Sequence, residues 1–517
     1  MARWTTRGTA VATLGMSLWL SGCSLPALVD RPASFALPPE QAAQTTLGRG
    51  IAPVLEPRGD LSGFHTLADP QDAFAARALL SHAAEKTLDV QYYIWRDDIT
   101  GILLLEELHA AAQRGVRVRL LLDDNGTSGL DSWLVALDSH PLIEVRLFNP
   151  FSLRSPKSLG FVTHFSRANR RMHNKSLTAD NSATIVGGRN IGDEYFGASD
   201  GVLFADLDVL AIGPVVQATS NDFDRYWASA SAYPVAGLLP AVPPEQLQQL
   251  QTRSSLVEQE PAAAQYVQAL QQLPFIQQLL DGQLPLQWAA ASIVSDDPAK
   301  GLGQAAGHGL LSQQLAVILG QPQRNIELVS PYFVPTAAGV EAFAQLTARG
   351  VRVRILTNAL EATDVAAVHS GYAKRRKALL EAGVELFEMR RNSQAAKARD
   401  KAGPFGSSGS SLHAKTFAVD GEQVFVGSFN FDPRSLNLNT ELGFVIQSPT
   451  FARQIQAVFD QDMLQSAYQV QLTDDGQLYW LERQGEQVRR LDQEPGTSFW
   501  QRTGVTLLSW LPIEWLL

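Results

Sequence analysis

The chain of 517 residues is almost free of cysteine, with Cys23 as its single thiol. One cysteine excludes an intrachain disulfide and any metal site built on several thiolates. Positive charge is also scarce, because 42 lysines and arginines face 52 acidic residues, a formal net charge of −10. Since non-specific nucleic-acid binding depends on neutralising phosphates with basic side chains, this balance disfavours a nucleic-acid partner, although a local basic groove remains compatible with it.

The N-terminus has the features of a secretory signal. Two arginines precede a short apolar stretch, Ala10 to Leu20, which is too short to span a bilayer comfortably. Leu20-Ser21-Gly22-Cys23 follows and resembles the lipobox of bacterial lipoproteins, in which the cysteine is lipidated. We therefore expect residues 1–23 to be a lipoprotein signal peptide and the protein to be anchored to a membrane, facing the periplasm. The sequence leaves open which membrane holds it.

One short pattern occurs once in each half of the chain. Each copy reads His-x-Lys-x4-Asp and is followed by Gly-[Gly/Ser]-x-Asn. Two copies with the same internal spacing indicate two similar halves that each give one histidine, one lysine and one asparagine to a shared site. The candidate site residues are His173, Lys175, Asp180 and Asn190 in the first copy, and His413, Lys415, Asp420, Ser428 and Asn430 in the second.

The sequence around these motifs is repeated as well. Arg114 to Leu121 and Arg349 to Leu356 share the order Arg-Gly-Val-Arg-Val-Arg, and each follows a β-rich run and a stretch with helical spacing of apolar residues. Two copies of strand, helix and strand in the same order argue for duplication. We therefore expect an α/β fold of two similar halves, each a mixed β-sheet flanked by helices, with the active site at their interface.

Composition outside the motifs sets the boundaries of the halves. A stretch with several prolines and little periodicity follows the signal peptide and is typical of a tether, and a stretch rich in Pro, Gln and Leu connects the halves. The predicted segments are 1–23 (signal peptide with lipobox), 24–62 (tether), 63–235 (first half), 236–285 (connecting segment), 286–468 (second half) and 469–517 (hairpin and amphipathic C-terminal tail).

Two features outside the motifs bear on the substrate. The tail carries Trp510 and Trp515 among leucines, which suits either a membrane interface or a terminal helix docked on the protein. Basic residues cluster from Lys374 to Lys401, which suits either a solvated helix face or contact with anionic lipid head groups. The sequence leaves both pairs of alternatives open.

The residue types of the motif suit phosphodiester chemistry without a metal or another cofactor. One histidine attacks phosphorus and becomes a phosphohistidine, while the other protonates the leaving alkoxide and then deprotonates the incoming alcohol or water. Lysines and asparagines hold the charge of the non-bridging oxygens. Zinc is a weak alternative because lysine is a poor ligand. Asp180 and Asp420 lie off the face of the histidine and lysine, and we expect them to make structural hydrogen bonds.

These motifs resemble the signature of the phospholipase D superfamily, from about Phe64 to Ala467. The form Gly-Gly-Arg-Asn of the first copy and the ending Trp-Leu-Pro-Ile-Glu-Trp-Leu-Leu resemble bacterial cardiolipin synthases of the C type. The resemblance implies transfer of a phosphatidyl group onto phosphatidylglycerol at a membrane surface, with phosphatidylethanolamine as a candidate donor. Since the histidine of the first motif usually attacks in this superfamily, it also implies His173 as nucleophile and His413 as acid and base.

The resemblance further implies a carboxylate behind each histidine to orient its ring. Glu441 falls at the matching position after Asn430. In the first half an insertion changes the spacing, and alignment of Ala-Asp-Leu with Thr-Glu-Leu selects Asp206, with Asp208 as the alternative. A carboxylate at one ring nitrogen fixes the tautomer and stabilises the imidazolium.

Four functions share these residues. The first is a phosphatidyltransferase that makes cardiolipin, and the second is a phospholipase D-type hydrolase in which water replaces the alcohol acceptor. The third is a phosphodiester nuclease, which the net charge of −10, the lipid signal and the tail disfavour. The fourth is an inactive lipid-binding relative, which two intact motifs disfavour. The motifs alone do not separate transfer from hydrolysis.

Overall fold

The computed structural model describes residues 25–28, 31–154, 156–197, 206–391, 412–461 and 463–517. The predicted signal peptide and its lipidation site Cys23 lie outside the described residues, as does the part of the basic cluster beyond residue 391. Among the described residues, no helix has both the length and the apolar composition that crossing a bilayer requires.

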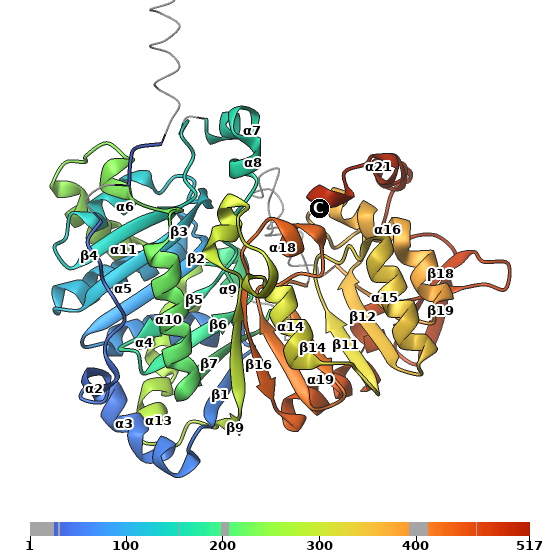
Figure 1. Cartoon of the computed structure of the whole chain (residues 1–517), viewed down its shortest axis with the longest axis horizontal. Coiled ribbons are helices and arrows are strands. Elements are labelled where there is room, and N and C mark those ends of the chain that lie inside the picture. Colours follow the sequence, from blue (N-terminus) through green and yellow to red (C-terminus); the bar gives the residue numbers. More distant parts are fainter. Residues whose placement is uncertain (1–24, 29–30, 155, 198–205, 392–411, 462) are drawn as a thin grey trace, which may run out of the picture.

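Two large β-sheets, one in each half, meet in the middle of the molecule (Figure 1). The first has the order β8 (Ala232–Pro234), β4 (Ile143–Phe148), β3 (Arg117–Gly126), β2 (Thr87–Ile94), β5 (Ser176–Ala179), β6 (Ala183–Gly187), β7 (Asp208–Ile212), β1 (Ser62–Leu67) and β9 (Gln287–Ala289). The second has the order β10 (Ala291–Ser295), β16 (Leu442–Gln447), β15 (Gln423–Gly427), β14 (Thr416–Val419), β11 (Asn325–Val329), β12 (Arg352–Asn358), β13 (Glu385–Met389), β17 (Ala467–Leu472), β18 (Leu478–Gln484) and β19 (Gln487–Leu491).

The two sheets share one strand order. In the first, β4-β3-β2-β5-β6-β7-β1 run side by side, and in the second the equivalent run is β13-β12-β11-β14-β15-β16-β10. In each run the first three strands are parallel and the remaining neighbours are antiparallel. This equivalence confirms the predicted α/β fold of two similar halves with mixed sheets.

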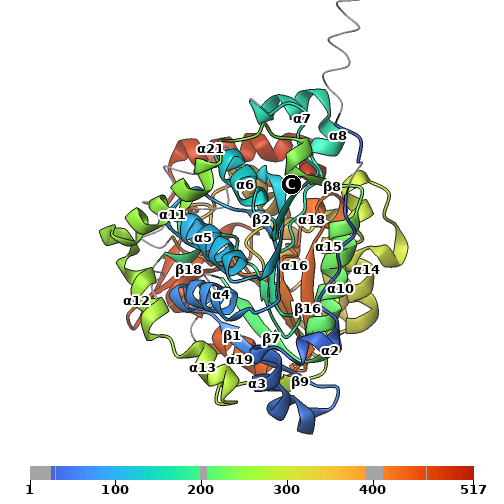
Figure 2. The same cartoon turned by 90° about the vertical axis from the view of Figure 1, so that its left-hand side faces the viewer.

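Helices cover the sheets on both sides, and Figure 2 shows α4 and α5 on one side of the first sheet with α10 on the other. In the first half and the connecting segment the helices are α2 (Pro39–Ala42), α3 (Thr46–Leu55), α4 (Pro70–Ala83), α5 (Ile99–Gln113), α6 (Asp131–Asp138), α7 (Gly160–Thr163), α8 (Phe165–Ala168), α9 (Asp193–Phe196), α10 (Pro214–Ala228), α11 (Glu245–Glu258), α12 (Ala264–Gln272) and α13 (Phe275–Leu280). In the second half they are α14 (Leu311–Leu319), α15 (Thr336–Ala348), α16 (Ala366–Glu381), α18 (Pro433–Asn437), α19 (Pro449–Gln461), α20 (Met463–Ser466) and α21 (Phe499–Trp510).

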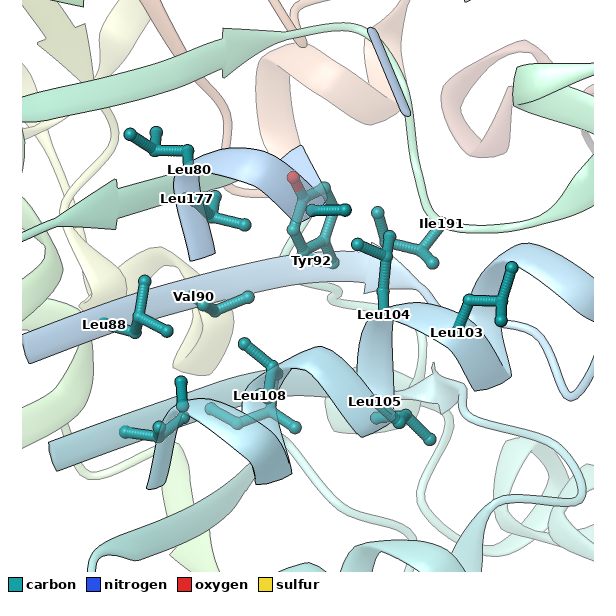
Figure 3. Close-up of a cluster of buried hydrophobic side chains, with 14 of the residues drawn as sticks. Leu80, Leu88, Val90, Tyr92, Leu103, Leu104, Leu105, Leu108, Leu177 and Ile191 are labelled. Carbon is teal, nitrogen blue, oxygen red and sulfur yellow. The ribbon is translucent and has the colours of Figure 1, made fainter. Parts of the chain in front are cut away.

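The repeated Arg-Gly-Val-Arg-Val-Arg sequence is the turn from a helix into a parallel strand. Gly115 after α5 and Gly350 after α15 have φ of 99° and 87°, a left-handed conformation that glycine adopts without a steric penalty. The strands β3 and β12 begin two residues later. In the first half, leucines of α5 then pack against Leu88, Val90 and Tyr92 of β2 (Figure 3). The duplicated sequence therefore builds the same β-α-β unit twice.

The halves are joined by a shared hydrophobic core. It contains buried side chains from β1, β6 and β7 of the first sheet and from β15 and β16 of the second. Phe64 and Phe444 meet across it edge to face, with ring centroids 6.0 Å apart. The two sheets are therefore docked on each other through apolar burial, which holds their strand ends in fixed relative positions.

The expected tether is wrong over residues 39–62. This stretch forms α2 and α3 and enters β1. Leu47 and Ile51, one helical turn apart on α3, are buried in the core of the first half, and the Thr45 side chain accepts the Gly48 N–H at the start of the helix. Its prolines obscured this amphipathic helix in the sequence.

Two other segments form strands of the sheets, and this changes two of the predicted boundaries. β9 pairs with β1, so the second half begins with β10 at Ala291 and not at residue 286. The expected hairpin around Asp475-Gly476 is present as β17 and β18, but β17 also pairs with β13. The hairpin and a third strand, β19, therefore extend the second sheet, and only α21 and the residues after it form a separate tail.

The aspartates of the two motifs clamp the central strands. Asp180 accepts the backbone N–H groups of Glu85, Lys86 and Thr87 at 2.9, 2.7 and 2.9 Å, where β2 begins. Asp420 does the same for residues 323–325, where β11 begins. Both aspartates have positive φ, 51° and 56°, which Asp and Asn tolerate better than other non-glycine residues.

We expect Asp180→Ala to lower the free energy of unfolding by about 3 kcal/mol, because it leaves three backbone donors without an acceptor and adds strain at positive φ. Asp180→Asn is the matched control, since it keeps one side-chain oxygen and tolerates the same backbone conformation. Urea denaturation of the full chain measures both. Equal losses in the two variants would contradict the clamp.

Candidate active site

The two histidines lie at equivalent places in the two halves. His173 and Lys175 precede β5, His413 and Lys415 precede β14, and the asparagines follow β6 and β15. Because β5 with β6 and β14 with β15 are antiparallel pairs, the start of the first strand and the end of the second lie at the same edge. Each half therefore brings its histidine, lysine and asparagine to one edge of its sheet.

The backbone of the first histidine is bonded to the other half. The His173 N–H donates to the Thr440 carbonyl at 2.9 Å, and the Thr440 N–H donates to the Arg171 carbonyl at 2.9 Å. The strand β5 therefore begins only at Ser176, after His173 and Lys175, because the residues before it pair with the second half. The halves are joined by backbone hydrogen bonds at the site itself.

Each histidine is held by a carboxylate from the opposite half. Nδ1–H of His173 donates to Glu441 Oε2 at 2.8 Å, and Nδ1–H of His413 donates to Asp206 Oδ2 at 2.6 Å. All four side chains are buried. A carboxylate at Nδ1 fixes the tautomer that leaves the Nε2 lone pair available for attack or proton transfer.

Glu441 is itself fixed by two hydroxyl groups. Ser428, a candidate of the second motif, donates to Oε2 at 2.5 Å, and Ser435 donates to Oε1 at 2.9 Å. The backbone N–H of Glu441 donates to Asp296, which is also paired with Lys300 at 2.9 Å. Ser428 therefore acts through Glu441 on the ring of His173. Ser435 was not predicted as a site residue, because nothing in its spacing distinguishes it from other serines.

Asp206, and not the alternative Asp208, contacts a histidine. Asp208 instead accepts from Arg77 at 2.8 Å and from the Arg189 side chain at 3.1 Å, inside the first half. The motif glycine Gly188 makes room for Asp206, because a Cβ on this glycine would lie 2.3 Å from Asp206 Oδ1. The Gly-Gly form of the first motif is thus explained by the carboxylate that packs on it.

The lysines and asparagines of both motifs are buried beside the histidines. Nζ of each lysine donates to the carbonyl of the histidine two residues earlier in the chain. Asn190 Oδ1 accepts the Ile94 N–H at 3.2 Å, whereas Asn190 Nδ2 and Asn430 Oδ1 have no hydrogen-bond partner in the described part of the chain. The Asn190 amide N–H groups and the two ammonium groups can donate to an anionic oxygen, whereas Asn430 Oδ1 is an acceptor.

Two tyrosines that the motifs do not contain border the histidines. The Tyr93 ring lies edge-on to the His173 ring, with centroids 4.9 Å apart, and Tyr195 lies edge-on to His413 at 5.2 Å. Tyr93 stands near the carboxyl end of the central parallel strand β2, where site residues of α/β sheets gather. That position is the one signal in the sequence that pointed to it.

Burial controls the charge of the site. Burial, reinforced by Lys175 and Lys415, lowers the pKa of His173 well below its ordinary value, and burial with Lys415 lowers the pKa of His413 to about 4. Burial also lowers the pKa of Lys415 to about 8 and that of Lys175 well below its usual range. Both imidazoles are therefore neutral at pH 7 before an anion binds.

The two carboxylates differ in charge. Burial raises the pKa of Glu441 to about 7, against the attraction of Lys175. Burial acts in the same direction on Asp206, but His413 and then Arg189 outweigh it and lower the pKa of Asp206 below its ordinary value. His413 thus has a firmly ionised partner, whereas the partner of His173 is partly protonated at neutral pH.

The sequence and the fold match known proteins over most of their lengths. The family model described as cardiolipin synthase, PLD-like domain, matches residues 77–227 and 315–463. Cardiolipin synthase C of Escherichia coli K12 is 51% identical over 471 residues, which are 91% of this chain and 99% of that protein. Cardiolipin synthase A of Pseudomonas entomophila is 25% identical over 430 residues, 82% of this chain and 73% of that protein.

Among solved structures, phosphatidylserine synthase of Haemophilus influenzae superposes with a TM-score of 0.54 at 14% identity, covering 92% of this chain and 100% of that chain, a likeness in fold. The duplicated sheets agree with a family model that matches twice, once in each half. The chain therefore belongs to the phospholipase D-like cardiolipin synthase family.

Proposed function

We propose that the chain is a phosphatidyltransferase that moves a phosphatidyl group onto phosphatidylglycerol and so makes cardiolipin. The observation that carries this proposal is the pair of buried imidazoles, each with Nδ1 held by a carboxylate of the opposite half. The identity of 51% with cardiolipin synthase C, over nearly the whole length of both proteins, supports the same chemistry and the same class of substrate.

In the proposed first step, Nε2 of His173 attacks phosphorus of the donor phospholipid and the bond from phosphorus to the head-group oxygen breaks. The His413 imidazolium gives its Nε2 proton to the leaving oxygen, so a phosphatidyl-His173 intermediate and a free head-group alcohol form. The anionic phosphodiester favours protonation of His413, and the ionised Asp206 stabilises the resulting imidazolium.

In the second step, His413 takes the proton of a phosphatidylglycerol hydroxyl as that oxygen attacks phosphorus. The bond from phosphorus to Nε2 of His173 breaks, cardiolipin forms, and both histidines return to their starting states. Throughout, Lys175, Lys415 and the motif asparagines hold the non-bridging oxygens. His173 suits the attacking role because its burial and the partly protonated Glu441 keep its ring neutral.

The alternative is a phospholipase D-type hydrolase, in which water takes the place of the acceptor hydroxyl with the same residues. The partners we propose are phosphatidylglycerol as acceptor, phosphatidylglycerol or phosphatidylethanolamine as donor, and a membrane surface. The lipobox ending at Cys23 supports a membrane-anchored lipoprotein that faces the periplasm.

The deciding experiment incubates the full chain with head-group-labelled and acyl-labelled phosphatidylglycerol and phosphatidylethanolamine in mixed vesicles. We expect cardiolipin as the main product, with release of a head-group alcohol. Phosphatidic acid as the main product would establish the hydrolase instead. The labelled head group that is released identifies the donor lipid.

In the same assay, His173→Ala and His413→Ala are each expected to lose at least about a thousandfold in rate, because each removes a chemical step. Acid-labile label retained on quenched His413→Ala, and absent from His173→Ala, would mark His173 as nucleophile. Full activity of His413→Ala would sink the two-histidine mechanism.

We expect Asp206→Asn to lower kcat about a thousandfold with little change in KM, because an amide cannot stabilise the His413 imidazolium. Glu441→Gln should cost only about tenfold, since the partly protonated Glu441 serves mainly to orient the His173 ring. Steady-state kinetics compare the two variants. Equal losses would contradict the different charges assigned to the two pairs.

The activity should fall as pH rises through about 8, because Lys415 loses its charge there and no longer holds the phosphate. The group is charged below this pKa and neutral above it, so kcat/KM declines on the alkaline side. In Lys415→Arg the guanidinium stays charged. The decline of kcat/KM should therefore shift to a higher pH, whatever the absolute rate of the variant. If the decline stays at the same pH in this variant, it is caused by another group.

A further inference from the structure

Large apolar side chains that are exposed gather at one end of the molecule. They lie on α7 and α8 of the first half and on α21 and the residues after it, all at the top of Figures 1 and 2. The exposed fraction is 80% for Val162, 78% for Trp500 and 74% for Trp510. We name this surface the aromatic ridge, and its main residues are Val162, Phe165, Trp500, Leu507, Trp510 and Trp515.

The ridge is one surface built from both halves. The rings of Phe165 and Trp515 lie edge to face with centroids 6.4 Å apart, which joins α8 to the C-terminal segment. On α21, Val505 is buried while Trp500, Leu507 and Trp510 are exposed, so the helix is docked by one face and leaves its larger apolar side chains outside. Contiguous exposed apolar area of this kind marks a contact site.

The ridge is fixed close to the catalytic residues. Arg434, four residues after Asn430, donates from its backbone N–H to the Leu517 carbonyl at 2.8 Å and from its side chain to Asn169 Oδ1 at 2.6 Å. Glu514 accepts two hydrogen bonds from Arg375 of α16 at 3.0 and 2.8 Å. These bonds tie the C-terminal segment to the second half, and Arg434 in turn joins the first half through Asn169.

A cationic groove lies beside the ridge. The inner side of α21, together with α16 and β18, lines a groove of about 570 Å³. Four basic residues line it against two acidic ones, Asp492 and Glu494, and Glu494 is paired with Arg376. Of the remaining basic residues, Lys374 and Lys377 are exposed. Apolar side chains outside and ammonium groups next to them are the pattern that binds the interface of an anionic lipid surface.

We propose that the aromatic ridge is the surface by which the protein docks on a lipid bilayer, with α21 lying in the interface and the groove facing anionic head groups. The choice of a bilayer over a protein partner rests on the proposed function, whose substrates are lipids. Independently of it, the first described residues, 25–28, lie at the same end (dark blue in Figures 1 and 2), two residues after the predicted lipidation site Cys23.

A lipid on Cys23 would lie within about 7 Å of the first described residue, since each residue spans at most about 3.5 Å. The anchor and the ridge would then reach the same membrane. Tryptophan is the residue that best suits such a position, because its indole is apolar on one side and polar at the nitrogen. A second copy of the chain is the competing occupant, and the test distinguishes it.

The test uses the full chain with Cys23→Ser in every variant, so that no acyl chain holds the protein on the vesicle. Binding to vesicles of equal parts phosphatidylglycerol and phosphatidylcholine is measured by sedimentation, with His173→Ala added to every chain in this assay so that no lipid is turned over. The ridge variant combines Val162→Glu, Trp500→Glu and Trp510→Glu. The matched control places the same three charges at Leu256, Val317 and Val488, which are 60%, 70% and 52% exposed on α11, α14 and β19.

We expect the ridge variant to bind at least about tenfold more weakly and the control to bind normally, because charged residues cannot enter the interface. Lys374→Glu with Lys377→Glu should weaken binding to anionic vesicles and leave binding to phosphatidylcholine alone unchanged. Equal vesicle binding of ridge variant and control would overturn the proposal. So would a dimer, seen in sedimentation velocity without lipid, that the ridge variant loses.

Activity on a short-chain phospholipid below its micellar concentration separates this proposal from the proposed function. The ridge variant should keep its rate on this soluble substrate while losing its rate on vesicles. A wild-type chain that binds vesicles through the ridge but transfers no phosphatidyl group would refute the proposed function and leave the docking surface standing. Unchanged thermal unfolding of the variants excludes misfolding as the cause.

Discussion

The site depends on the exchange of two carboxylates between the halves. Glu441 of the second half holds His173, and Asp206 of the first half holds His413. Neither histidine has its carboxylate partner within its own half, so both histidine–carboxylate pairs exist only when the two sheets are docked. The shared apolar core and the backbone bonds between Thr440 and residues 171–173 keep that docking fixed. Duplication has therefore produced one composite site and not two independent ones.

The exchange also supplies a physical basis for the different roles that we propose for two equivalent motifs. The duplicated residues are alike in position, but the carboxylates are not, since one is a glutamate bonded by Ser428 and Ser435 and the other an aspartate packed on Gly188. Their surroundings drive their pKa values in opposite directions. Two titratable groups pushed apart in this way are a common basis for assigning nucleophile and acid. The asymmetry lies outside the motif, in the residues that surround it.

The motifs and the repeated Arg-Gly-Val-Arg-Val-Arg sequence were sufficient to predict two mixed sheets with the histidines at their interface. They carried this information because strand ends and a left-handed glycine require particular residues at particular spacings. The crossing of Glu441 and Asp206 could not be predicted, since spacing along one chain does not say which of two similar halves a side chain faces. The helix α3 was missed for a different reason. Its Pro53 and the prolines around it resemble those of a linker, while Leu47 and Ile51 bury one face of the helix.

In the proposed mechanism, transfer and hydrolysis differ only in the hydroxyl group that reaches the phosphohistidine. Water is abundant in bulk solvent, whereas phosphatidylglycerol is concentrated only in the plane of a bilayer. A site held at that plane meets its lipid acceptor at a high effective concentration, as any tethered reactant does. The bonds of Arg434 to the C-terminal segment and to Asn169 therefore bear on the reaction itself, because they fix the distance between the aromatic ridge and the histidines. Transfer and hydrolysis would use the same six motif residues. On the proposed docking, the choice between a lipid and water as acceptor therefore depends on how close the site is held to the bilayer.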